Sequence, residues 1–176
     1  MNDVSQEFER FITNAWQGRA NGLWYMLVIG LGSQADEVQE NILSVIRNWL
    51  LIAAPVHREY GFPCEREVFP APEELKLRLP QWFMDDFAAY SEQQILESGW
   101  RYSYESWIWA MEERCWNWWG YERSGDLLTI QLQVDGWPCP TEELVYLARA
   151  AGAESVIVDD TVIYQLQGNG NNNCGG

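Results

Sequence analysis

The stretch WIWAMEERCWNWWG, residues 107–120, contains five tryptophans within thirteen residues. Tryptophan is the largest apolar side chain, and its indole N–H needs a hydrogen-bond partner once it is buried. A solvated surface this rich in indole rings would promote aggregation. The stretch is therefore expected to line a core, an interface or a ligand groove.

The Trp-rich stretch is predicted to be helical, together with the residues before it. Residues 104–118 carry almost no polar face, which indicates a largely enclosed helix. Residues 73–98 show two helical patterns separated by Pro80, and Gly99 ends the second. These segments together predict a helical insertion at about residues 73–118.

The N-terminal part is predicted to be helix, strand and helix. Apolar side chains recur at helical spacing within residues 1–20, which we assign to an N-terminal helix. Residues 23–29 form a continuous apolar run between glycines and predict a buried strand. Ser33 is then expected to cap a second helix that ends at Pro55.

The C-terminal part repeats the pattern of strand, helix and strand. Residues 127–134 alternate apolar and polar side chains, which predicts a half-buried strand. Thr141 and the acids after it indicate the start of a helix. Residues 154–158 and 161–166 predict two strands hinged at Asp159-Asp160, or one bent strand.

This order of elements predicts an α+β fold. We expect a ferredoxin-like sandwich, in which helices cover one face of a mostly antiparallel sheet. The domain is expected to span residues 21–166, followed by a flexible, low-complexity tail at residues 167–176. A chain of 176 residues is long enough to bury one substantial core.

The net charge of −15 restricts the classes of partner. It comes from 26 acidic and 11 basic residues. Such a surface repels phosphate backbones, so we expect no direct nucleic-acid binding. It favours a protein partner with a basic surface, and simple solubility is the alternative explanation of the same charge.

The cysteines and the longest apolar stretches bear on the compartment. Cys64, Cys115, Cys139 and Cys174 show no C-x-x-C spacing, so neither a zinc ribbon nor a thioredoxin motif is indicated. Four cysteines are too few for a disulfide scaffold. No signal-peptide pattern or bilayer-length apolar stretch occurs. We therefore expect a cytoplasmic protein that does not contact membranes.

Four segments occur in an order and spacing that resemble a known family. They are NGLWYMLVIG at residues 21–30, FPAPEEL at residues 69–75, the Trp-rich residues 106–120, and VDGWPCP at residues 134–140. Together they resemble the YubB-type ferredoxin-like family, carried on bacterial plasmids and phages. The resemblance spans roughly residues 20–166 and implies the fold and a mobile-element origin, but no activity.

The chain departs from that family at two places. Residues 120–123 read Gly-Tyr-Glu-Arg where the family has Gly-Thr-Lys-Trp, and Cys139 interrupts its Pro-Pro pair. We expect no catalytic set, cofactor or metal site. His57 is the sole histidine, and a solvated loop position is favoured for it over a catalytic pair with Cys64.

These observations predict a non-enzymatic accessory protein of a phage or plasmid. It would bind and modulate a host protein, for example as an inhibitor of a defence system, through an acidic surface. The carboxylates expected to cluster beside the last helix and strand pair are Glu142, Glu143, Glu154, Asp159 and Asp160. Their alternative roles are helix capping and solubility.

The alternative function is small-molecule binding or catalysis in an aromatic pocket. Its rings would be Trp107, Trp109, Trp116, Trp118, Trp119 and Trp137. Glu112 or Glu113 would supply the acid, although a salt bridge to Arg114 or Arg101 is favoured for them. A cavity lined by these rings would support this alternative, and solid packing would count against it. The oligomeric state stays open.

Overall fold

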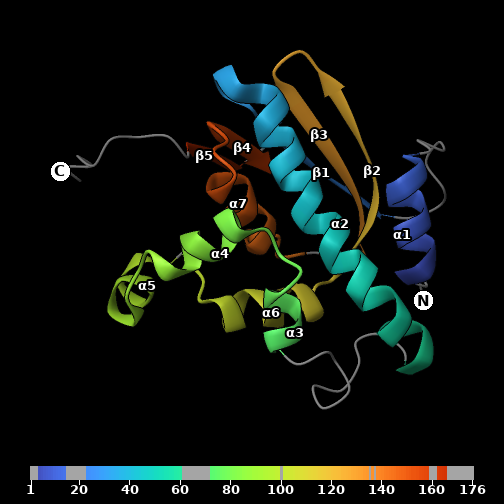
Figure 1. Cartoon of the computed structure of the whole chain (residues 1–176). Coiled ribbons are helices and arrows are strands. Elements are labelled where there is room, and N and C mark those ends of the chain that lie inside the picture. The colour runs from blue at the N-terminus through green and yellow to red at the C-terminus, as the bar shows by residue number, and fades with distance from the viewer. Residues whose placement is uncertain are drawn as a thin grey trace.

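The computed structural model describes residues 4–14, 23–60, 72–99, 101–134, 136, 138–158 and 162–165. A five-stranded sheet lies behind a layer of helices in Figure 1. The strands are β1 (Leu23–Gly30), β2 (Trp116–Ser124), β3 (Leu127–Val134), β4 (Ser155–Val158) and β5 (Val162–Gln165). The helices are α1 (Val4–Thr13), α2 (Ala35–Tyr60), α3 (Pro72–Lys76), α4 (Gln81–Ala88), α5 (Glu92–Ser98), α6 (Tyr104–Glu112) and α7 (Glu142–Ala150).

The sheet is antiparallel throughout, in the order β2-β3-β1-β4-β5. β1 pairs with β3 along its whole length and with β4 along its second half. The chain between β1 and β2 contains α2 to α6, and the chain between β3 and β4 contains α7. The predicted α+β class and antiparallel sheet are confirmed.

The core lies between the sheet and the helices. On β1, Leu27 and Ile29 are fully buried, whereas Met26 and Val28, which alternate with them, are half-buried. Ile46 and Trp49 of α2 are fully buried as well. The continuous apolar run of β1 therefore supplies one face to the main core, as expected of a central strand.

The Trp-rich stretch does not form the single helix predicted for residues 104–118. α6 ends at Glu112, and the chain becomes an edge strand, β2, at Trp116. Trp116 and Trp118 stand opposite Val134 and Leu132 of β3, and a bulge follows between Trp118 and Gly120. The prediction was wrong because both segments are apolar, which hides the change of period from 3.6 to 2. The helical part of the insertion therefore ends near residue 112, not 118.

Two further boundaries differ from those predicted. α2 continues through Pro55 to Tyr60, so Pro55 lies inside the helix and does not end it, although an internal proline removes one backbone hydrogen bond. Its start at Ala35 follows a short 3-10 turn at Gly32–Gln34, so Ser33 lies inside that turn and not at the N-cap of α2. At the C-terminal end, the two-strand alternative is confirmed by the pairing of β4 with β5.

The helical insertion is joined to α7 by a shared carboxylate. Asp86 of α4 accepts hydrogen bonds from Tyr146 Oη at 2.6 Å and from Arg149 Nη2 at 2.7 Å. Burial and the bond to Asp86 raise the pKa of Tyr146, so its hydroxyl stays a donor. Phe83 of α4 packs edge-on against Trp107 of α6, with ring centroids 5.0 Å apart.

Replacing Asp86 with alanine is expected to destabilise the protein by about 1–3 kcal/mol, because two largely buried donors lose their acceptor. Urea unfolding would measure this change. The control is Asp85→Ala, since Asp85 is exposed and bonds only Gln81 among the described residues. That variant should change stability by less than about 0.5 kcal/mol. Equal effects of the two variants would contradict the role given to Asp86.

No helix among the described residues has the length and apolar character needed to cross a membrane.

Candidate functional site

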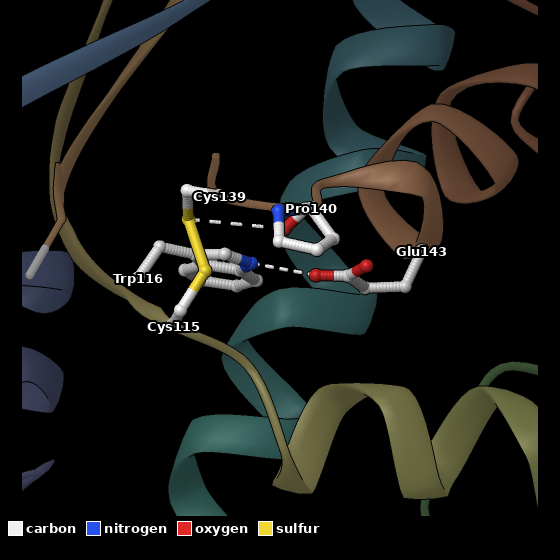
Figure 2. Close-up of a disulfide and its surroundings, with 5 residues drawn as sticks. All are labelled: Cys115, Trp116, Cys139, Pro140 and Glu143. Carbon is white, nitrogen blue, oxygen red and sulfur yellow. Dashed lines mark hydrogen bonds between the residues drawn. A yellow bond between two sulfur atoms is a disulfide. The ribbon is translucent and has the colours of Figure 1, made fainter. Parts of the chain in front are cut away.

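A disulfide joins two segments that enter different elements (Figure 2). Cys115 directly precedes β2, and Cys139 lies shortly before α7. The Cα atoms are 5.9 Å apart, a usual separation for a disulfide, and the residues are 24 positions apart in sequence. A single bond at such a spacing has no sequence signature, so it was not predicted.

The carboxyl group of Glu143 is buried beside this disulfide, facing Trp116 (Figure 2). Only 3% of the residue is exposed, and Trp116 Nε1 donates a hydrogen bond of 2.6 Å to Glu143 Oε1. Trp107 Nε1 donates to the backbone carbonyl of Glu143 at 3.1 Å. Two indole N–H groups, from α6 and β2, therefore meet the first turn of α7.

Glu143 is able to change its protonation state near neutral pH. Burial raises the pKa of its carboxyl to about 7, and the hydrogen bond from Trp116 offsets only part of that effect. Glu142 raises the pKa further, while the positive charge of Arg114 lowers it. Burial and the negative charge of Glu143 together raise the pKa of Tyr102 to about 12, so this neighbour stays neutral.

Arg114 links this site to α1 through a buried ion pair. Its Nη2 donates to Glu7 Oε2 at 2.8 Å, and both side chains are fully buried. The guanidinium also lies over the ring of Trp49, 4.2 Å from its centroid, a cation–π arrangement. The other oxygen of Glu7 accepts the backbone N–H of Trp118 at 2.5 Å. Helix α1 is thereby fixed to the edge strand β2.

Three of the predicted pocket tryptophans belong to the packed core. Trp107, Trp116 and Trp118 are fully buried. The ring of Trp118 packs 5.2 Å from that of Phe11 in α1. This burial argues against a ligand pocket formed by these rings.

The remaining aromatic candidates are placed differently. Trp109 is 48% exposed on the outer side of α6, whereas Trp119 is half-buried and packs edge-on against Trp24 with centroids 4.8 Å apart. Trp137 lies outside the described residues. The candidate rings among the described residues are therefore divided between core and surface and do not share one lining.

The acids proposed for that pocket are also separated. Glu112 is buried and Glu113 is exposed. Two open hollows are lined, among the described residues, by side chains other than tryptophan. One, of about 400 Å³, is lined by Asn14, Tyr121, Glu122 and Arg123. The other, of about 390 Å³, is lined by Ser33, Gln34, Ala35, Asp36, Glu37 and Arg123.

Among the carboxylates predicted to make the partner contact, Glu143 lies in the interior. Glu142 and Glu154 are exposed, but Glu143 is buried because neighbours on a helix point about 100° apart. Asp159 and Asp160 lie outside the described residues. Glu143 is therefore corrected from a surface acid to an interior one.

A different set of acids meets at one end of the sheet, around the turn that follows β1. Leu31 donates its backbone N–H to the Asp126 carbonyl at 2.8 Å, and the Glu154 N–H donates to the Gly30 carbonyl at 2.8 Å. Gly32, at φ 73°, lies directly under the Glu154 carboxylate, where a Cβ atom would be 2.5 Å from Oε1. Asp36 and Glu37 form the first turn of α2. We call the exposed residues Asp36, Glu37, Asp126 and Glu154 the acidic rim.

Arg123 of β2 borders the acidic rim, and its Nη1 contacts Asp36 Oδ1 at 2.5 Å. The rim was missed because its members lie in three separate segments of the sequence. The Asp36-Glu37 pair, at a predicted helix start, was the available signal. Among the described residues, no group of three or more His, Cys, Asp or Glu side chains is arranged to hold a metal ion.

Comparison of the chain with protein-family models, with curated proteins and with solved structures found no match. The resemblance to the YubB-type family therefore stays a prediction from its motifs. Functional inference for this chain depends on its own residues.

Proposed function

We propose that this chain is a non-enzymatic accessory protein of a phage or plasmid that binds and modulates a host protein through its acidic surface. The acidic rim is the observation that carries this proposal. Its four exposed acids lie on the segments that meet at the turn after β1, and Arg123 pairs with Asp36. Several charges are needed at such a surface, because one exposed ion pair contributes only about 0–1 kcal/mol.

The proposed fold of this binding protein is ferredoxin-like. Support comes from the strand order β4-β1-β3-β2, in which α2 and the insertion lead from β1 to β2 and α7 leads from β3 to β4. Two such split connections around a four-stranded antiparallel sheet define the β-α-β-β-α-β arrangement. β5 is then an added edge strand.

The partner is proposed to present a basic surface, such as the nucleic-acid groove of a host defence protein. The net charge of −15 favours encounter with such a groove over long range. Salt should weaken the complex, because charges on exposed groups are screened within about 10 Å at 0.1 M ionic strength. The phage or plasmid origin rests on the motif resemblance alone.

Reversing the charge of the acidic rim should weaken partner binding. In the triple variant Glu37→Lys, Asp126→Lys and Glu154→Lys, we expect at least about a tenfold loss of affinity for the basic protein captured by the unaltered chain. The matched control reverses three exposed acids on the insertion, Glu92, Glu97 and Glu105.

Both variants gain the same net charge, so a general charge effect would weaken them equally. Calorimetric titration of the captured partner would compare the two variants at low and high salt, after thermal unfolding has shown that both are folded. Equal binding by the rim variant and the unaltered chain would place the contact elsewhere. A complex that is insensitive to salt would reject the electrostatic argument.

A further inference from the structure

The first turn of α7 is held to the start of β2 by two kinds of connection. One is covalent, the Cys115–Cys139 disulfide. The other is the hydrogen bond from Trp116 Nε1 to the Glu143 carboxyl, beside which Trp107 Nε1 of α6 donates to the Glu143 carbonyl. Both connections join the same two segments, as Figure 2 shows for the disulfide and the Trp116–Glu143 bond.

The two cysteines of the disulfide differ in exposure. Cys139 is 4% exposed, whereas Cys115 is half-buried. An incoming thiolate must approach one sulfur along the S–S axis, so access favours attack on Cys115. In a reducing compartment such as the predicted cytoplasm, thiol reductants attack accessible disulfides.

We propose that the Cys115–Cys139 bond is a redox-controlled latch that holds the N-terminal end of α7 against the start of β2 and is opened by a dithiol reductant. The reductant's thiolate attacks Cys115 Sγ, and the S–S bond breaks with its electron pair passing to Cys139 Sγ, which takes up a proton. The second thiol of the reductant then displaces Cys115 as a thiol. The protein disulfide is reduced to two thiols, and the dithiol is oxidised to a disulfide.

When the disulfide is reduced, the contacts of Glu143 still hold the first turn of α7 to the start of β2. We call this contact between α7 and β2 the joint. The free energy of keeping Glu143 buried depends on its protonation, because an ionised carboxylate at this position lacks the water that would stabilise its charge, and the hydrogen bond from Trp116 offsets only part of that cost. The charged groups that face it are Glu142 on α7 and Arg114 before β2, and the neutral Tyr102 hydroxyl lies before α6. Glu142 opposes ionisation of Glu143 and Arg114 favours it. The reduced joint should therefore open more readily at higher pH.

Hydrogen–deuterium exchange of the full chain tests the latch. Reduction with dithiothreitol should speed exchange of the backbone amides in residues 138–146 by at least about tenfold, while β1 and β3 change by less than about twofold. The Cys115→Ser and Cys139→Ser double variant should reproduce the reduced pattern without reductant. Alkylation of the unreduced chain should modify neither Cys115 nor Cys139.

Repeating the exchange experiment at two pH values isolates the contribution of the Glu143 carboxyl group. After correction for intrinsic exchange, the reduced chain should open more at about pH 8 than at about pH 6, and Glu143→Gln should remove that difference because an amide does not ionise. Unchanged exchange on reduction would overturn the latch. So would an equal acceleration across the whole sheet, because the disulfide would then be a global staple. A pH difference that survives in Glu143→Gln would overturn the part assigned to Glu143.

Discussion

Replacing Glu7 with alanine is expected to destabilise the protein by about 3–5 kcal/mol, because it removes one partner of a buried ion pair and leaves the other charge in the interior. Both the Glu7 and Arg114 side chains are fully buried. The variant also takes away the acceptor of the Trp118 backbone N–H, at the edge of the sheet. Urea unfolding followed by tryptophan fluorescence would measure the change in free energy.

A double-mutant cycle gives this expectation its control. Arg114→Ala and Glu7→Ala together should cost at least about 1 kcal/mol less than the sum of the two single changes, because the double variant leaves no buried charge behind. Glu9→Ala on the exposed side of α1 should have an effect below about 0.5 kcal/mol. Strict additivity of the cycle would show that the ion pair does not couple α1 to β2.

The sequence indicates α1 but not its attachment. Apolar side chains at helical spacing predict the helix, and Phe11 packs on Trp118 from that face. The pairing of Glu7 with Arg114 joins residues 107 positions apart, and a glutamate at a predicted helix start is ordinarily solvated. No local pattern distinguishes a buried acid of this kind from a surface one.

The Trp-rich stretch shows why local patterns fail at a change of element. The alternation of Trp116, Asn117 and Trp118 is the only period-two signal before the bulge, and three residues are too few to outweigh the helical pattern that precedes them. By contrast, residues 127–134 alternate over a whole strand, and β3 occupies those residues. The length of a regular pattern therefore decided which strand could be predicted.

The burial of Glu143 was available from helical spacing. Tyr146 and Leu147 lie three and four positions further along α7, on the same side of the helix, and both are buried. Because Glu142 and Glu143 are adjacent acids, both were predicted to lie on the surface. The hydrogen bond from the indole N–H of Trp116 could not be predicted, because Trp116 lies on a strand 27 positions earlier in the sequence. This bond gives the buried carboxyl of Glu143 a partner in the interior.

Glu143 should make the stability of the oxidised protein fall as the pH rises. Its pKa in the folded protein, about 7, lies above the ordinary value of 4.5, so the native state holds the proton more tightly than the unfolded state. The stabilisation is complete below about pH 4.5 and is lost progressively as the pH rises through about 7. The full loss is about 3 kcal/mol, from a pKa difference of roughly two to three units.

Glu143→Gln isolates this contribution, because the amide cannot ionise and its oxygen still accepts the hydrogen bond from Trp116 Nε1. Urea unfolding should show the variant within about 1 kcal/mol of the unaltered chain at about pH 4, and more stable by about 3 kcal/mol at about pH 8. Glu142→Gln, at the exposed neighbouring position, should leave the pH dependence largely intact. Parallel stability curves for Glu143→Gln and the unaltered chain would mean that the Glu143 carboxyl is already ionised in the folded protein, and that Arg114 compensates its burial fully. The pH dependence therefore decides between a neutral acid and a compensated charge at the centre of the joint between β2 and α7.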